Sequence, residues 1–161
     1  MTWLLIVFGI ALVLSPLMWL QQSPHQKRIT ELRRQAGQSS LQVSLHRRPD
    51  AREDELRLEA VCYRLPWRDT DCRQDWVLQR RSSRGWPSEI DGWYWMAQAA
   101  DQQWHDLLAQ SLSQLPAGVS AIVADAQGIG VIWDERGDQD ELNLICEFLH
   151  SLRQKAEEIC L

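Results

Sequence analysis

The sequence lacks the short motifs that mark many catalytic and cofactor sites. It contains no G-x-S-x-G nucleophile motif, no phosphate-binding loop and no H-E-x-x-H zinc motif. An enzyme whose site is assembled from distant residues remains an alternative, because such a site needs no local motif. We therefore predict no catalytic or cofactor-binding residue and expect a protein that is not an enzyme.

The cysteines lack the spacing of a metal or redox site. None of Cys62, Cys72, Cys146 and Cys160 belongs to a C-x-x-C pair, and no histidine lies beside them at zinc-ligand spacing. In a reducing compartment we expect free thiols. Cys62 in an apolar strand and Cys146 in a helix are typical of small core residues.

The chain also lacks an excess of positive charge. Its 17 basic and 22 acidic residues give a net charge of −5, which argues against a general nucleic-acid binder. Residues 25–84 hold 14 basic and 9 acidic residues (+5), and residues 85–161 hold 3 and 13 (−10). The basic part either meets anionic lipid headgroups or is a solvated surface.

Charge is entirely absent from Thr2 to Leu20. As a helix these residues would reach about 28 Å, close to the roughly 30 Å hydrocarbon core of a bilayer. The run has no basic start and no small-residue cleavage site, so it indicates an anchor and not a cleaved signal. Trp3 and Trp19 stand at its ends, as interfacial aromatics do, and Pro16 would kink it. We predict a transmembrane helix within residues 1–22.

Basic residues follow this run, as they do on the cytoplasmic side of a span. They are Lys27, Arg28, Arg33 and Arg34. Ser23 and Gln26 have the pattern of a capping box, which predicts a basic juxtamembrane helix over residues 23–37. We expect a single-pass protein of the bacterial inner membrane, with the bilayer as a partner, a periplasmic N-terminus and a cytoplasmic domain over residues 38–161.

That domain has the pattern of an α+β fold with a mostly antiparallel sheet of about five strands and two packing helices. The predicted strands cover residues 41–45, 55–65, 75–80, 119–124 and 129–133. A helix is the alternative for residues 55–65. Short connections predict a meander for the first three strands and a hairpin for the last two.

Two helices follow from apolar residues at spacings of three and four. One covers residues 97–115, and the other begins near Asp138, which with Glu141 forms a second capping box. The stripe on the second helix comprises Leu142, Ile145, Leu149, Leu152, Ala156 and Ile159. This stripe either packs on the sheet or joins a second copy in a homodimer.

Four aromatic residues within ten positions are the strongest indication of a contact surface. They are Trp86, Trp93, Tyr94 and Trp95. Such a density is typical of a partner surface, but it also fits a loop that fills the core.

Acidic residues gather at Asp134, Glu135, Asp138, Asp140 and Glu141. Carboxylates could hold a divalent cation, but the order of a calcium loop is missing, and negative charge is also favourable at a helix N-terminus. The histidines are scattered, so we predict no metal site.

The residues Ser23-Pro24-His25-Gln26-Lys27-Arg28 after the apolar run resemble the start of the YajC family. The resemblance covers residues 1–35 and implies an accessory subunit of the Sec preprotein translocase. The later residues depart from that family. With Trp133-Asp134-Glu135-Arg136-Gly137, the whole chain is similar to uncharacterised single-pass proteins of gammaproteobacteria.

We therefore expect a membrane-tethered, non-enzymatic interaction domain whose partner is a membrane protein, the Sec translocon being one candidate. The alternative is a membrane-bound enzyme or small-ligand sensor with a pocket between sheet and helices. Convergence of His105, Asp125 or a cysteine in such a pocket would favour the alternative.

Overall fold

The computed structural model describes residues 3, 23–68, 74–82 and 84–159. The chain divides into two compact units, residues 1–31 and 32–161. In the first unit, Ser23 caps the start of helix α2 (Pro24–Gln38): the Gln26 N–H donates to Ser23 Oγ (3.2 Å), and the Ser23 N–H donates to Gln26 Oε1 (3.1 Å). This confirms the first predicted capping box.

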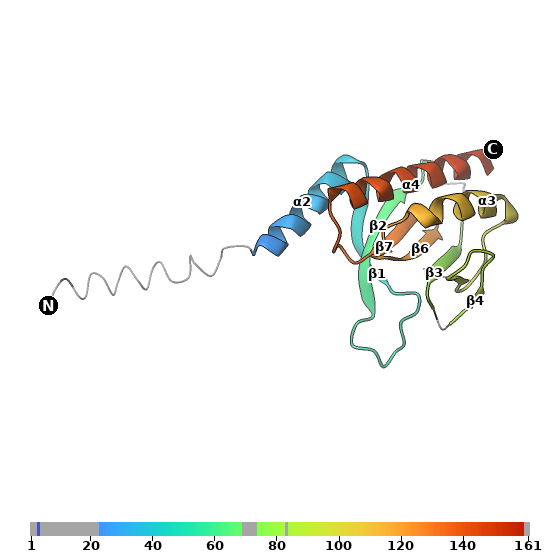
Figure 1. Cartoon of the computed structure of the whole chain (residues 1–161), viewed down its shortest axis with the longest axis horizontal. Coiled ribbons are helices and arrows are strands. Elements are labelled where there is room, and N and C mark those ends of the chain that lie inside the picture. The colour runs from blue at the N-terminus through green and yellow to red at the C-terminus, as the bar shows by residue number, and fades with distance from the viewer. Residues whose placement is uncertain (1–2, 4–22, 69–73, 83, 160–161) are drawn as a thin grey trace. The chain divides into compact units, whose positions relative to one another are not determined.

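The second unit is an α+β fold around one seven-stranded sheet in which every pairing is antiparallel. Its strands are β1 (Gln42–Arg47), β2 (Glu59–Pro66), β3 (Trp76–Arg80), β4 (Trp86–Pro87), β5 (Trp93–Trp95), β6 (Val119–Asp125) and β7 (Gly128–Trp133). Their order in space is β1-β2-β7-β6-β3-β5-β4. Helices α3 (Gln102–Ser111) and α4 (Gln139–Ile159) lie together over one face of the sheet (Figure 1), and a short helix η1 (Leu112–Gln114) follows α3.

The transmembrane part of the predicted fold class is wrong for the chain that the structure describes. No helix among the described residues is long and apolar enough to cross a bilayer. Helix α2 has 15 residues and is basic, and α4, with 21 residues, carries charges along its length. The predicted span lies outside the described residues except for Trp3. The predicted single-pass localisation in the inner membrane depended on that span, so this prediction is wrong as well.

The predicted meander is also wrong. Strands β2 and β3 do not pair, because the β6–β7 hairpin lies between them in the sheet. That hairpin is confirmed, with Ala124 opposite Ile129 and Asp125 opposite Gly128. Strand β7 passes close to β2 at Gly128. A Cβ atom at this position would lie 2.4 Å from the Leu65 carbonyl oxygen, so the close approach requires a residue without a side chain. Among the described residues the sheet has seven strands instead of about five, because β4 and β5 form between the predicted strands 75–80 and 119–124, where no strand was expected.

The main core lies between the sheet and the helices. Trp76, Trp104, Trp133 and Tyr63 are fully buried there, and Trp76 meets the edges of Trp104 and Trp95 at centroid distances of 5.4 and 6.0 Å. The predicted α4 stripe is buried from Leu142 to Ala156, as core packing requires. A second, smaller cluster occupies the other face of the sheet: Cys62, Ala121, Val123 and Ile132.

Candidate functional site

The two outer strands of the sheet differ in their capacity to accept another strand. Strand β4 has two residues, and the second is Pro87, which has no N–H to donate. Strand β1 has six residues and no proline, and within the described chain it pairs only with β2. A long outer strand without proline is a ready template for pairing with another chain. The free side of β1 is therefore the candidate functional site.

The register identifies the main-chain groups that β1 offers. The Arg48 N–H donates to the Leu58 carbonyl oxygen (2.8 Å), and the β1–β2 register pairs Arg47 with Glu59 and Ser44 with Cys62. Bonded and non-bonded pairs alternate in an antiparallel ladder, so even-numbered β1 residues direct their N–H and C=O groups toward β2. The N–H and C=O groups of Val43, Leu45 and Arg47 point outward.

The side chains of β1 add an apolar contact beside this row. Leu45 is 67% exposed and shares the helix-side face with half-buried Val43 and its cross-strand neighbour Val61. At the far end, the Arg47 carbonyl oxygen lies 2.7 Å from His46 Nδ1, so an imidazole N–H already satisfies that outward acceptor. The open part of the edge is therefore centred on Val43 and Leu45.

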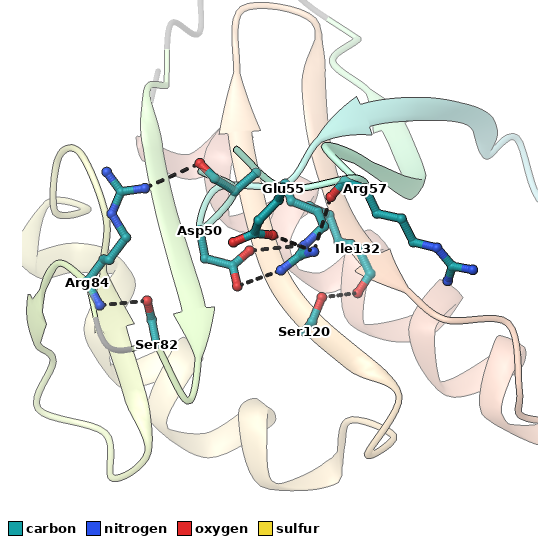
Figure 2. A network of polar contacts seen from close by, with 9 residues as sticks. Asp50, Glu55, Arg57, Ser82, Arg84, Ser120 and Ile132 are labelled. Atoms are coloured by element: carbon teal, nitrogen blue, oxygen red, sulfur yellow. Dashed lines mark hydrogen bonds and ion pairs between the residues drawn. The ribbon is translucent and has the colours of Figure 1, made fainter. Parts of the chain in front are cut away.

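The loop between β1 and β2 holds the end of β1 in place. The Arg48 guanidinium donates to both carboxylate oxygens of Asp50 (3.2 and 3.0 Å), to Glu55 Oε2 (3.2 Å) and to the Arg57 carbonyl oxygen (3.2 Å). Hydrogen bonding to Asp50 raises the pKa of Arg48 against the opposing effect of burial. Figure 2 shows Asp50 and Glu55 converging on the face of the sheet opposite the helices, and Arg84 Nη1 donates to the carbonyl oxygen of Ala51 in the same loop (3.3 Å). The loop thus lies across the face of the sheet that holds the second core cluster.

The four aromatic residues of the predicted partner surface are divided between core and surface. Trp93 and Trp95 are each 4% exposed and belong to the core, whereas Tyr94 is half-buried and Trp86 is 45% exposed. Tyr94 and Trp86 lie on the β5–β4 side of the sheet, far in strand order from β1. The core interpretation therefore holds for Trp93 and Trp95, and a partner surface around Trp86 remains a prediction.

The predicted membrane-anchor residues also fall into separate groups. Pro16 and Trp19 lie outside the described residues, and Trp3 is exposed. Lys27 and Arg28 are exposed on the first part of α2, and Arg34 is exposed on its second part.

Arg33, the remaining anchor candidate, makes a defined contact within the second unit. Its Nε and Nη2 atoms donate to the two carboxylate oxygens of Glu135, both at 2.7 Å, and Tyr63 Oη donates to Glu135 Oε1 at 2.7 Å. Glu135 is 5% exposed and has a left-handed backbone with φ of 57°. Burial, and then the hydrogen bond to Glu135, raise the pKa of Tyr63 well above its usual value. This cluster fastens the part of α2 that belongs to the second unit to the turn between β7 and α4.

A small pocket beside α3 contains the residue types of a hydrolase but not their geometry. The pocket has a volume of about 160 Å³, and Ser88, Glu89, Trp95 and His105 line it. His105 Nδ1 faces Glu89 Oε2 (3.2 Å), and Nε2 faces the Ala100 carbonyl oxygen (3.1 Å). The Ser88 hydroxyl donates instead to the Ile90 carbonyl oxygen (3.1 Å). Among the described residues, therefore, no basic side chain accepts the Ser88 hydroxyl proton, as activation of a nucleophile requires.

The other residues named for an enzyme do not join His105. Asp125 accepts a hydrogen bond from Arg64 Nη1 (2.6 Å) at the β6–β7 turn. Cys62 on β2 and Cys146 on α4 are buried free thiols, and burial raises the pKa of both. Cys72 and Cys160 lie outside the described residues.

The predicted acidic cluster is divided in the same way. Asp138 Oδ1 accepts the N–H groups of Asp140 and Glu141 (3.1 Å each), which confirms an N-cap for α4, and Glu135 pairs with Arg33. Within the described chain, no three metal-ligating side chains are grouped for a metal ion.

Comparison with known proteins identifies no relative: no family model, curated protein or solved structure matches the chain. The free side of β1 must therefore be interpreted from its geometry alone. The alternating residues of β1 could be predicted from the sequence. Its role as a candidate binding edge could not, because β1 is an outer strand only through the order of the strands in the sheet.

Proposed function

We propose that the chain is a non-enzymatic interaction domain that binds an extended segment of a partner protein along β1. The observation that carries this proposal is the contrast between the two outer strands, one short and closed by Pro87 and the other longer and open. Strand addition of this kind draws its affinity from main-chain hydrogen bonds and its specificity from alternate side chains.

The outward groups of β1 define what the partner segment must supply. Val43 and Leu45 offer two N–H donors and two C=O acceptors, and each hydrogen bond made is worth about 0.5–1.5 kcal/mol net. An added strand would also place one of its side chains beside exposed Leu45. The preferred partner is therefore an extended segment with apolar residues at alternate positions.

The partner's identity stays a prediction. The resemblance of residues 1–35 to the YajC family suggests a Sec translocase component, and the α4 stripe suggested a second copy. Burial of that stripe from Leu142 to Ala156 leaves β1 as the better candidate surface for either partner.

Site-specific photocrosslinking in cells that produce the full-length chain tests the proposal. A photoreactive residue replaces Ser44, whose main-chain groups face β2 and whose side chain is exposed. The matched control places the same residue at Gln110, which is exposed on α3. We expect a protein adduct at position 44 that is absent at position 110.

A second substitution asks whether the adduct depends on the strand edge. Leu45→Pro removes an outward N–H without breaking a bond to β2, and Leu45→Thr retains that N–H. We expect Leu45→Pro to reduce the yield of the adduct at least about tenfold, because a tenfold weaker binding corresponds to the loss of one or two net hydrogen bonds. Leu45→Thr should reduce the yield less. Circular dichroism verifies that both variants fold. The same adducts at both positions, an adduct indifferent to proline, or none at position 44 would each refute the proposal.

A further inference from the structure

A hollow between the end of β3 and helix α3 has a different chemistry from the β1 edge. Its volume is about 570 Å³, within the few hundred to one thousand Å³ of small-molecule sites. Arg80, Arg81 and half-buried Ile90 line the side of β3 and β5, and exposed Ala109 and Ala117 line the opposite side, above the buried side chains of Leu112 and Leu115. The hollow therefore combines two cationic groups with an apolar wall.

The register explains why these groups meet. Arg80 is the last residue of β3 and pairs with Trp93, the first residue of β5. Its guanidinium carbon lies 5.0 Å from the Trp93 ring centroid, and Nη1 donates to the Pro116 carbonyl oxygen (3.0 Å). One bond fixes the guanidinium on the ring and leaves its other N–H donors available.

Arg81 adds a second positive charge at the same rim. Its backbone is left-handed (φ 54°), and its N–H donates to the Gly92 carbonyl oxygen (2.9 Å), which fixes the β3 end against the start of β5. Burial, and then the charge of Arg81, lower the pKa of the Arg80 guanidinium. Neither arginine forms an ion pair with a carboxylate of the described chain, although exposed Asp91 also lines the hollow.

We infer that this hollow binds a small organic carboxylate with an aromatic or aliphatic body. Guanidinium groups match the planar carboxylate, and half-buried Ile90 with exposed Ala109 and Ala117 supplies the accessible surface for the apolar body. Adjacent like charges repel, so an anion that bridges Arg80 and Arg81 gains from both. This site is independent of the proposed strand addition at β1.

Three probes separate the charge from the apolar body. Calorimetric titration of the full-length chain uses 4-phenylbutyrate, its neutral amide and acetate. We expect saturable binding of 4-phenylbutyrate, and affinities at least about tenfold weaker for the amide, which lacks the charge, and for acetate, which lacks the body.

Two variants locate the binding. Arg81→Asn removes one charge and tolerates the left-handed backbone, and Arg57→Gln removes a matched exposed charge on the β1–β2 loop. We expect Arg81→Asn to weaken binding about tenfold or more and Arg57→Gln to leave it unchanged, with circular dichroism verifying both folds. No saturable binding of 4-phenylbutyrate, equal binding of its amide, or equal loss in both variants would each overturn the inference.

Discussion

Arg33 and Glu135, 102 positions apart in the chain, form a pair of parallel hydrogen bonds of 2.7 Å each. The carboxylate belongs to a buried residue, and the guanidinium lies on the part of α2 that carries core residues Leu32 and Ala36. A residue proposed from the sequence to face lipid headgroups thus has a specific protein partner. It secures the segment that leads into β1.

Removal of this guanidinium should destabilise the second unit. Arg33→Gln leaves the Glu135 carboxylate buried with one fewer charged donor, and we expect a loss of about 1–3 kcal/mol in the free energy of unfolding. Urea denaturation of the full-length chain measures this. Arg136→Gln is the control, because Arg136 is highly exposed and lies 3.7 Å from Asp134; a change below about 0.5 kcal/mol is expected there. Equal losses would refute the assignment.

Tyr63 should make stability fall in alkaline solution. Its folded-state pKa is raised above the usual value of 10.0, so the folded protein retains a proton that the unfolded chain releases. This contribution is fully present below pH 10 and is lost as pH rises toward the folded-state pKa. Unfolding free energies at pH 8, 10 and 11 should decline, and Tyr63→Phe, although less stable at pH 8, should decline less steeply. Parallel declines would contradict the assignment.

The β1–β2 loop should control access to Cys62. Arg48→Ala removes the bonds to Asp50, Glu55 and the Arg57 carbonyl, so we expect the loop to open more often. Iodoacetamide should then modify Cys62 of the native protein at least about tenfold faster, as measured by mass spectrometry. A tenfold change corresponds to a free energy of loop opening that is lower by roughly 1.4 kcal/mol. Arg57→Ala should match the unmodified chain, because Arg57 contributes its carbonyl to the network and not its side chain. Unchanged labelling in Arg48→Ala would show that the loop does not protect Cys62.

Substitutions in the aromatic segment should separate core from surface. Trp95→Ala removes a buried ring that contacts Trp76, and we expect a cost of about 3–5 kcal/mol. Trp86→Ala, at an exposed position, should cost less than about 1 kcal/mol. Urea denaturation measures both. A large cost at Trp86 would mean that the ring contributes to the fold and is not available as a partner surface.

The features that could be predicted from the sequence are those encoded by neighbouring residues. The Ser23–Gln26 capping box, the β6–β7 hairpin and the α4 stripe each depend on contacts a few positions apart. The insertion of β6 and β7 between β2 and β3 could not be predicted, because strands with similar apolar patterns can pair in several orders. For the same reason, the open side of β1 and the meeting of Arg80 with Trp93 required the three-dimensional structure.

The proline that ends β4 limits how molecules of this protein can assemble. Pro87 closes one outer strand of the described sheet, and β1 is the open one. Once β1 pairs with a strand of a second copy or with a segment of another protein, the described sheet has no open outer strand left for a further copy. Fibrous polymerisation through successive strand pairing is therefore disfavoured by the architecture itself.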